Sequence, residues 1–274
     1  MFGLKKNNNK AKIFVFANQK GGVGKTTTAI NLGCAIAGAG EKVLIIDLDP
    51  QGNASTGLGI NKDDRKFSTY DILTSEQTII DIKYKTLVQN LDIVPSTLDL
   101  LGLEAVLAED NEKSYKLKLA VEELEAQSKN EYDYILIDCP PSLSLLTIMA
   151  LVGSDTVLVP LQSEFFALEG LSQLVKTINR VKQNLNTALS IQGIVLTMFD
   201  KRNKLCYEVE KEARKYFPNE VYKTVIPRNI RISEAPSHGL PVITYDKNCS
   251  GTKAYEKLAH EILEQEKQNN TFAA

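Results

Sequence analysis

A glycine-rich stretch near the start of the chain constrains the fold more than any other feature. Residues 13–28 read IFVFANQKGGVGKTTT, an apolar run typical of a buried strand, then a glycine turn, then a segment with helical periodicity. This order is the context of a phosphate-binding loop, because glycines let backbone N–H groups turn toward phosphate oxygens and the helix N-terminus adds partial positive charge. The stretch therefore predicts an α/β protein of the P-loop NTPase type.

The loop also supplies side chains that suit a nucleotide and its metal ion. Lys25 is expected to reach the β- and γ-phosphates, and the Thr26 hydroxyl to bind Mg²⁺. The residues expected to contact the nucleotide are Gly21, Gly22, Val23, Gly24, Lys25, Thr26 and Thr27. The alternative, a chance glycine-rich turn between a strand and a helix, is disfavoured because context and spacing agree.

The motif departs from the ordinary P-loop at its first position. The pattern G-x-x-x-x-G-K-[ST] would place glycine at position 19, where this chain has Gln19 followed by a second lysine, Lys20. Lys20 lies too early to share the role of Lys25 on the same nucleotide. It is suited instead to reach the phosphates of a nucleotide held by a second subunit. The loop is therefore of the deviant Walker A type, with Lys20, Lys25 and a later carboxylate as candidate catalytic residues.

Two further buried strands are expected to end in carboxylates at one edge of the sheet. Residues 42–47 (KVLIID) lead into Asp47 and Asp49, and residues 134–138 (YILID) end in Asp138. Ligands collect at the carboxyl ends of parallel strands, so we expect Asp47 and Asp138 to hold the water shell of Mg²⁺. Asp49 is expected to orient or deprotonate the attacking water. The alternative is that Asp47 and Asp49 only cap the following turn.

Strand and helix patterns alternate along the chain. Further strands are expected at residues 91–95, 155–161 and 191–198, and helices at residues 98–107, 115–124, 168–181 and 255–263. This alternation predicts a doubly wound, mostly parallel sheet flanked by helices. We expect a single P-loop NTPase domain over residues 13–264, with a disordered basic tail over residues 1–12 and a polar tail over residues 265–274.

Composition excludes several classes of function. The 274 residues include 32 Lys and Arg and 34 Asp and Glu, so any nucleic-acid binding must come from a local patch. The four cysteines are widely spaced without a C-x-x-C pair, which argues against zinc and iron–sulfur sites. No signal peptide or long apolar run is evident, so we expect a cytoplasmic protein with no membrane association.

A basic region in the last third of the chain is the candidate for such a patch. Residues 201–231 hold nine Lys or Arg against four Glu, and the bases include Arg202, Arg228 and Arg231. A local basic surface suits contacts to the phosphate backbone of DNA, which are largely blind to sequence. The alternative is a salt-bridged helix face, because glutamates alternate with other residues over 208–212, and the charge pattern alone does not decide.

Four sequence blocks resemble the ParA/Soj family of chromosome- and plasmid-partitioning ATPases. They are N-Q-K-G-G-V-G-K-T-T-T, D-L-D-P-Q-G-N-A, L-I-D-C-P-P-S and I-P-R-N-I-R-I-S-E-A-P-S-H-G, and they are spread over residues 18–239. The first three are shared with the wider deviant-Walker class, which includes MinD and the nitrogenase iron protein. The last block is more specific to Soj-like proteins. The resemblance therefore covers almost the whole chain.

The resemblance implies an ATP-driven switch in DNA partitioning. It implies ATP and Mg²⁺ as cofactors and a sandwich homodimer in which Lys20 contacts the partner's nucleotide. Asp49 would support slow hydrolysis. The ATP dimer would bind double-stranded DNA without sequence preference on the nucleoid. A ParB/Spo0J-like protein at a centromere-like site would then stimulate hydrolysis and release the dimer from DNA.

Residue assignments in the C-terminal half follow from the same resemblance. Arginines matching Arg202 and Arg231 are expected to contact DNA phosphates, and Arg228 joins them from the same basic region. Pro227 and Asn229 are expected to lie near the base of the nucleotide. Only residues 1–12 precede the first expected strand, so an additional N-terminal helix-turn-helix domain is not expected.

Two competing interpretations make different demands on the sequence. A MinD-like positioning ATPase that cycles on membranes predicts a basic amphipathic C-terminal helix, which residues 256–272 do not supply. A metabolic kinase or ligase built on the same loop predicts a pocket for an acceptor substrate, and no residues call for one. The partitioning switch is therefore the leading hypothesis.

Overall fold

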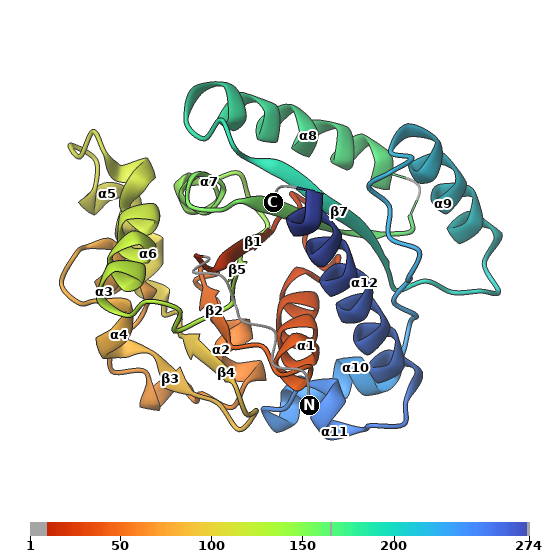
Figure 1. The fold of residues 1–274 in the computed structure, drawn as a ribbon, viewed down its shortest axis with the longest axis horizontal. Helices are drawn as coiled ribbons and strands as arrows, with labels where there is room; N and C mark the ends of the chain where they lie inside the picture. The colour runs from red at the N-terminus through yellow and green to blue at the C-terminus, as the bar shows by residue number, and fades with distance from the viewer. Residues whose placement is uncertain (1–9, 165, 273–274) are drawn as a thin grey trace.

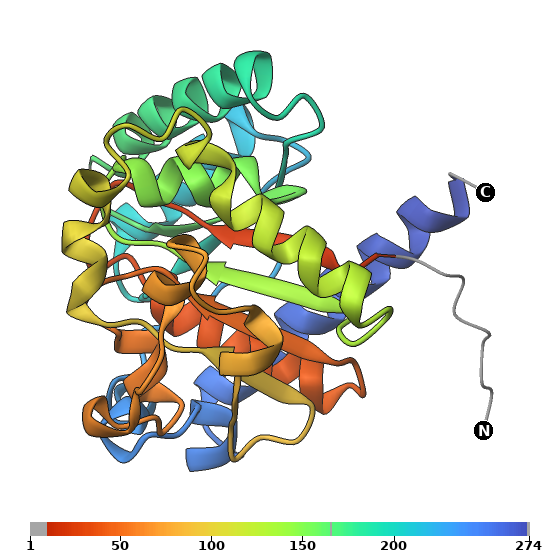
Figure 2. The same ribbon diagram turned by 90° about the vertical axis from the view of Figure 1, so that its left-hand side faces the viewer.

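A seven-stranded sheet runs through the centre of the molecule, with helices on both of its faces (Figures 1 and 2). The computed structural model describes residues 10–164 and 166–272. The strand order is β3-β4-β2-β5-β1-β6-β7, and all neighbours are parallel except the antiparallel pair of β3 and β4 at one edge. This confirms the predicted doubly wound, mostly parallel α/β fold.

The strands and long helices follow the expected alternation. The strands are β1 (Lys12–Phe16), β2 (Val43–Asp47), β3 (Tyr84–Lys85), β4 (Leu91–Val94), β5 (Tyr134–Asp138), β6 (Thr156–Gln162) and β7 (Ser190–Thr197). The longer helices of the described residues are α1 (Lys25–Gly38), α6 (Lys116–Gln127), α7 (Leu145–Val152), α8 (Ala167–Asn184), α9 (Lys204–Tyr216) and α12 (Ser250–Phe272).

Short helical turns connect these elements. The short α-helices are α2 (Asn53–Gly57), α3 (Thr69–Leu73), α4 (Ile79–Ile82), α5 (Leu103–Val106), α10 (Ile230–Glu234) and α11 (Val242–Tyr245). The 3-10 turns are η1 (Lys62–Asp64), η2 (Leu98–Gly102), η3 (Lys113–Tyr115) and η4 (Ala235–His238). The segment expected to be helical over residues 98–107 is thus η2 followed by the single turn of α5.

The central strands are apolar throughout because both of their faces are covered. Phe14 and Phe16 of β1 pack in one core with α1 and α12, whereas Val15 between them packs in the other core with α6, α7 and α8. On the first side, α12 lies along α1, where the Tyr255 hydroxyl is 3.4 Å from the Thr28 hydroxyl. This packing fixes the orientation of α1, whose N-terminus carries the P-loop.

The last helix is longer than periodicity predicts. The polar tail expected over residues 265–274 is instead part of α12 as far as Phe272. Glu266 is buried, and its carboxylate accepts a hydrogen bond from Gln192 Nε2 at 2.9 Å. Polar residues thus continue the helix because the edge strand β7 supplies a hydrogen-bond partner. Apolar periodicity in the sequence carries no signal of that contact. The first nine residues of the expected basic tail lie outside the described residues, and Lys12 already belongs to β1.

Candidate nucleotide site and basic surface

The P-loop joins β1 to α1 at the carboxyl edge of the sheet, as the sequence predicts. Gly22 and Gly24 have φ of 75° and 92°, a left-handed conformation that side chains other than glycine rarely adopt. Gly24 is the N-cap of α1, and no described side chain caps this end. The first N–H groups of α1 are therefore available to a phosphate.

Lys25 lies at the start of α1 with most of its surface buried. Its ammonium group donates to the Lys20 carbonyl oxygen at 3.2 Å. Burial lowers the pKa of Lys25, and the negative charges of Asp138 and Asp49 act in the opposite direction. The ammonium group is thus held near carboxylates inside the site, where a phosphate would strengthen its charged form.

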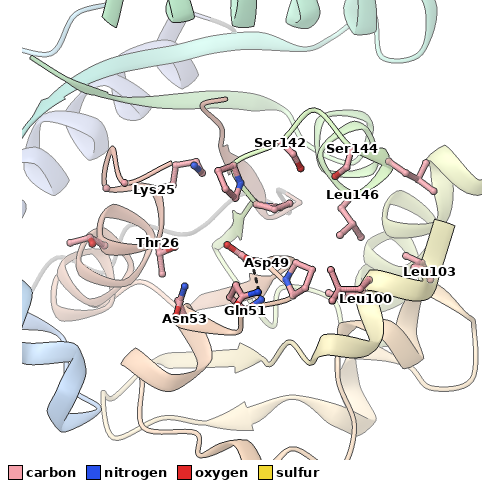
Figure 3. A pocket seen from close by; sticks show the side chains of 18 of the residues that line it. Lys25, Thr26, Asp49, Gln51, Asn53, Leu100, Leu103, Ser142, Ser144 and Leu146 are labelled. Atoms are coloured by element: carbon pink, nitrogen blue, oxygen red, sulfur yellow. Dashed lines mark hydrogen bonds between the residues drawn. The ribbon is translucent and has the colours of Figure 1, made fainter. Parts of the chain in front are cut away.

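The P-loop forms one wall of a pocket of about 590 Å³ (Figure 3). Loop and α1 residues on this wall are Gly22, Gly24, Lys25, Thr26 and Thr27. The turn after β2 adds Asp49, Gln51 and Asn53. Apolar residues of η2, α5 and α7 form the opposite wall, including Leu100, Leu103 and Leu146. A pocket of this size accommodates a nucleotide-sized ligand.

Two predicted loop contacts do not line this pocket. The Val23 side chain is buried, and its carbonyl oxygen accepts a hydrogen bond from Thr197 Oγ1 at 2.7 Å. Gly21 lies toward Pro141, whose Cβ would be 3.8 Å from an added Cβ on Gly21. Val23 therefore anchors the loop to β7.

A second pocket of about 300 Å³ adjoins the first and shares Gly24, Thr27 and Met198 with it. Pro227 and Asn229 line this second pocket, so both residues predicted near the base lie next to the P-loop. Met198, which the sequence did not single out, has φ of 50° just after β7. A left-handed methionine between two pockets is the kind of backbone outlier that marks functional sites.

Asp138 provides the clearest candidate ligand for a metal ion. Its Cα is the register partner of Asp47 across β5 and β2, and both side chains are fully buried. Neither carboxylate oxygen of Asp138 has a regular hydrogen-bond partner among the described residues, although the Thr26 hydroxyl is close enough to favour the charged form. Burial, followed by the charge of Asp47, raises the pKa of Asp138 well above its ordinary range. An orphaned carboxylate beside Thr26 fits a divalent cation.

Asp47 is engaged differently from Asp138. Its carboxylate accepts hydrogen bonds from the Ser55 hydroxyl at 2.7 Å, the Ser55 N–H at 2.9 Å and the Asp49 N–H at 3.1 Å. Burial nevertheless raises the pKa of Asp47 to about 6. These bonds shape the turn after β2, so the capping role considered from the sequence is present. A role for Asp47 as a magnesium ligand stays a prediction.

Asp49 lies at the pocket, as predicted for a residue that acts on the attacking water (Figure 3). One of its carboxylate oxygens accepts the Gln51 N–H at 3.0 Å. Among the described residues no group of three or more His, Cys, Asp or Glu forms a ready metal site. A magnesium ion here would therefore complete its ligands with phosphate oxygens and water, which is its usual preference in nucleotide sites.

Lys20 stands apart from the pocket of its own chain. Its ammonium group pairs with the Glu164 carboxylate in the loop after β6, and both side chains are partly exposed. Lys20 is not among the residues that line the nucleotide pocket. This placement agrees with a lysine that does not serve the nucleotide of its own subunit.

Arg202 and Arg228 line a separate hollow of about 710 Å³. We call it the basic hollow, and its basic residues are Lys201, Arg202, Lys223, Arg228, Lys253 and Lys257. Of these six, and within the described part of the chain, only Arg202 forms an ion pair, with Asp200 at 2.9 Å. The hydrogen bonds from Arg202 hold the pKa of Asp200 at about 2. The hollow is therefore strongly positive at neutral pH.

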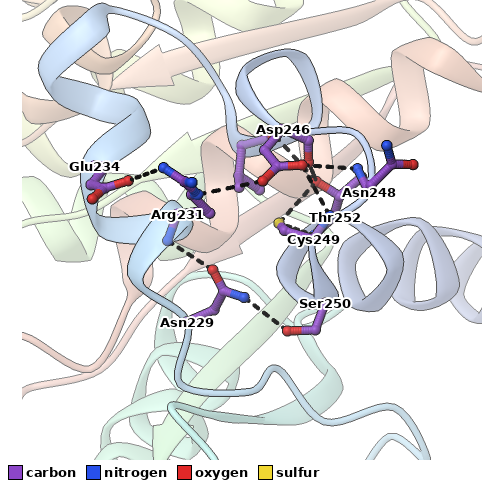
Figure 4. A network of polar contacts seen from close by, with 9 residues as sticks. Asn229, Arg231, Glu234, Asp246, Asn248, Cys249, Ser250 and Thr252 are labelled. Carbon is purple, nitrogen blue, oxygen red and sulfur yellow. Dashed lines mark hydrogen bonds and ion pairs between the residues drawn. The ribbon is translucent and has the colours of Figure 1, made fainter.

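Sequence reasoning missed two residues of the basic hollow, and the DNA contact expected of Arg231, which lies outside the hollow, stays a prediction. Lys253 and Lys257 lie four residues apart on α12, and that spacing was the available signal. Arg231 does not line the hollow and lies in a network with two acids (Figure 4). Its Nη1 is 2.9 Å from Glu234 and its Nε is 3.5 Å from Asp246.

Part of the basic region on α9 follows the alternative of a salt-bridged helix. Arg214 on α9 pairs with Glu210 at 2.9 Å and donates to the carbonyl oxygens of Val221 and Tyr222. Arg214 therefore holds α9 to the following segment. The basic region divides into a structural part on α9 and an open part in the basic hollow.

Three features together define a P-loop ATPase of the deviant Walker A class. They are a glycine loop between β1 and α1 of a mostly parallel sheet, a lysine before the glycines, and an orphaned aspartate at the end of β5. Residues 11–191 match the family described as AAA domain. The chain is 52% identical over 266 residues to the chromosome partitioning protein ParA of Caulobacter vibrioides, covering 97% of this chain and 99% of that protein.

Two further relatives carry related names. The sporulation initiation inhibitor protein Soj of Bacillus subtilis is 53% identical, covering 92% of this chain and 98% of that protein. The chromosome-partitioning ATPase Soj of Treponema pallidum is 50% identical, covering 92% and 97%. The chain therefore belongs to the ParA/Soj family of chromosome-partitioning ATPases, and it is an ATPase.

Solved structures agree on the fold. A structure described as cobyrinic acid a,c-diamide synthase from Mycobacterium smegmatis with bound ADP and magnesium has a TM-score of 0.82 at 31% identity, covering 94% of this chain and 96% of that one. The septum site-determining protein MinD of Pyrococcus horikoshii, complexed with Mg-ADP, has a TM-score of 0.74 at 27% identity, covering 92% and 96%. No described helix of the present chain is long and apolar enough to span a membrane.

Proposed function

We propose that this protein is an ATP-dependent DNA-partitioning switch. The ATP-bound form is a sandwich homodimer that binds double-stranded DNA without sequence preference, and hydrolysis releases it. The main support for this proposal is that the pocket next to the P-loop and the basic hollow share residues. Pro227 and Arg228 line both the pocket next to the P-loop and the basic hollow, so one segment joins the nucleotide to the DNA surface.

ATP and Mg²⁺ occupy the pocket in this proposal, with the base toward Pro227 and Asn229. Lys25 and the N–H groups of the loop bind the phosphates, while Thr26 and Asp138 hold the ion. An ion held by these residues would supply positive charge beside the β- and γ-phosphates. Asp49 orients the attacking water at the edge of the pocket. Hydrolysis is slow and therefore sets the lifetime of the ATP-bound form. A partner protein stimulates it.

Lys20 acts across the dimer in this proposal. Within its own chain it lies outside the nucleotide pocket and is paired with Glu164. A second subunit that faces the carboxyl edge of the sheet would bring each Lys20 to the nucleotide of the other. Dimerisation therefore depends on the γ-phosphate, which offers the charge that replaces Glu164.

DNA binding falls to the basic hollow. Five of its six cations have no ion-pair partner among the described residues, so they are free to meet phosphates. Contacts of this kind release counterions and are insensitive to base sequence. A ParB/Spo0J-like protein bound at a centromere-like site stimulates hydrolysis. The ATPase itself is cytoplasmic and associated with the nucleoid during this cycle.

A MinD-like cycle on membranes is the alternative, and the likeness to MinD supports it at the level of the fold. Such a cycle needs an apolar helix face that is free to enter lipid. The apolar face of α12 is used inside the protein, because Tyr255, Leu258 and Ile262 are buried against the core. The partitioning switch therefore fits the C-terminal helix better.

The test is binding to a random-sequence DNA duplex in the presence of ATP, measured by fluorescence anisotropy. Lys253→Glu with Lys257→Glu should weaken binding by at least tenfold and flatten its salt dependence, because two phosphate contacts are lost. Arg180→Glu, which reverses the charge of an exposed residue on α8, is the matched control and should bind DNA nearly as well as the wild type. Equal affinity of the double variant and wild type would remove the basic hollow as the DNA surface.

A further inference from the structure

A buried arginine lies behind the loop that follows β2. Arg65 is only 9% exposed, and its guanidinium donates to the Ile60 carbonyl at 2.8 Å, the Thr56 hydroxyl at 2.7 Å and the Ser96 carbonyl at 2.9 Å. Within the described residues its hydrogen-bond partners are all neutral oxygens. Burial lowers the pKa of Arg65, and the charge of Asp47 opposes this. A buried cation without a carboxylate partner is costly, which indicates a specific role.

Ser96 connects this arginine to Asp49. The Ser96 carbonyl accepts from Arg65, and its hydroxyl donates to the Asp49 carbonyl at 2.6 Å. The Ser96 N–H donates to the Ser55 hydroxyl at 3.0 Å, and Ser55 in turn donates to the Asp47 carboxylate. That carboxylate accepts the Asp49 N–H. The backbone of Asp49 is thus held at both its N–H and its carbonyl by one buried network.

Gly52 brings the guanidinium against the same loop. An added Cβ on Gly52 would overlap Nη1 of Arg65 and would lie 3.0 Å from the Ser96 carbonyl oxygen. Gly52 has φ of 63°, and its N–H donates to the Asp49 carbonyl at 2.8 Å. Arg65 therefore sets the position of the turn from Asp49 to Gly52 by direct packing as well as through Ser96.

We propose that Arg65 is a positioning residue for ATP hydrolysis, which acts through Ser96 and Gly52 to hold Asp49 at the nucleotide pocket. The inference rests on the proposed role of Asp49. Arg65 itself does not line the pocket, so its loss leaves the P-loop contacts to the nucleotide in place. A shift of about 1 Å in a catalytic group lowers a rate by up to roughly a hundredfold. The expected defect is therefore in kcat and not in nucleotide affinity.

The test compares kcat for ATP with the Kd of a fluorescent ATP analogue in Arg65→Ala, Ser96→Ala, Asp49→Ala and the double variant Arg65→Ala with Asp49→Ala. Arg65→Ala should lower kcat by roughly ten- to a hundredfold at unchanged Kd, and Ser96→Ala should act in the same direction. The double variant should be no slower than Asp49→Ala, because both changes remove the same function. Arg180→Ala, an exposed arginine on α8, is the control and should hydrolyse ATP at the wild-type rate.

A rescue experiment separates positioning from general loss of structure. Ethylguanidinium should restore part of kcat in Arg65→Ala by entering the space beside Gly52, and it should leave Arg180→Ala unaffected. Equal losses of kcat and ATP affinity in Arg65→Ala, or fully additive losses in the double variant, would overturn the proposal. If Arg65→Ala fails to fold, an unchanged kcat in Ser96→Ala overturns it.

The outcomes also separate this inference from the proposal on which it rests. Normal kcat in both Arg65→Ala and Ser96→Ala, together with a slow Asp49→Ala, would overturn the role of Arg65 alone. Hydrolysis at the wild-type rate by Asp49→Ala would overturn the role of Asp49 and this inference with it.

Discussion

Lys20 and Glu164 form an ion pair within one chain, between the residue just before the glycines of the P-loop and the loop that follows β6. A lysine that is to meet the nucleotide of a second subunit must first leave this partner. Because both side chains are partly exposed, the pair is weak and solvent-screened. Release of Lys20 is therefore easily driven by a more strongly charged partner such as a γ-phosphate.

We predict opposite effects of two substitutions at this pair. Lys20→Ala should leave ATP binding by the monomer intact and abolish ATP-dependent dimerisation, whereas Glu164→Gln should favour the dimer by a few-fold because Lys20 is released. Analytical ultracentrifugation with and without ATP measures both. A dimer of normal strength in Lys20→Ala would show that the lysine does not act across the interface.

Lys25→Ala should abolish nucleotide binding. Lys25 is the buried cation at the P-loop. Its removal takes away the positive charge that binds the phosphates, and a backbone N–H cannot replace that charge. A loss of at least a hundredfold in affinity for ATP is expected by calorimetry, with Lys176→Ala on the exposed face of α8 as the matched control. Affinity within a few-fold of the wild type would mean that the nucleotide lies elsewhere.

Asp200→Asn should strengthen DNA binding. Arg202 makes two hydrogen bonds to the Asp200 carboxylate, at 3.0 Å and 2.9 Å, so removal of that charge frees a guanidinium at the rim of the basic hollow. Affinity for a DNA duplex at low salt should rise several-fold, and its salt dependence should steepen by up to about one phosphate contact. Glu123→Gln removes an exposed charge on α6, which contributes no residue to the hollow, and should change neither quantity. Weaker binding by Asp200→Asn would mean that the pair orients Arg202 for DNA.

The unfolding free energy of the nucleotide-free protein should depend on pH through the titration of Asp47. Burial raises its pKa from 3.8 to about 6, so the folded state binds a proton more tightly than the unfolded state. That stabilisation is complete below about pH 4 and is lost as the pH rises through about 6. Asp47→Asn carries no such charge, so its unfolding free energy should gain roughly 2 kcal/mol relative to wild type between pH 4 and pH 7.

Urea unfolding at a series of pH values measures this difference directly. Comparison with the wild type at each pH cancels the contributions of carboxyl groups whose pKa is lowered, such as Asp110 and Asp200. A difference that does not change with pH would show that Asp47 has an ordinary pKa in the folded protein.

Features that follow from one motif or from the ends of parallel strands were predictable. Lys25, Thr26 and the glycines share one loop. Asp49 follows β2 and Asp138 ends β5, and the carboxyl ends of these two strands meet at one edge of the sheet. Strand periodicity and motif spacing therefore place them without any knowledge of side-chain packing.

Features that depend on distant packing could not be predicted in the same way. Lys253 and Lys257 join Arg202 and Arg228 only because α12 lies beside the segment after β7. Arg65 reaches Ser96 across 31 positions of sequence, and nothing in the pattern around either residue signals that contact. The continuation of α12 likewise depends on a strand that comes far earlier in the chain, through Gln192.

The measurement that tests the central claim most directly is binding to a random-sequence DNA duplex without nucleotide, with ADP and with ATP, for wild type and Asp49→Ala. A partitioning switch predicts binding with ATP only, and stronger or longer-lived binding for Asp49→Ala, because that variant keeps its ATP. Absence of DNA binding in every state, or equal binding in all three, would contradict the proposed function.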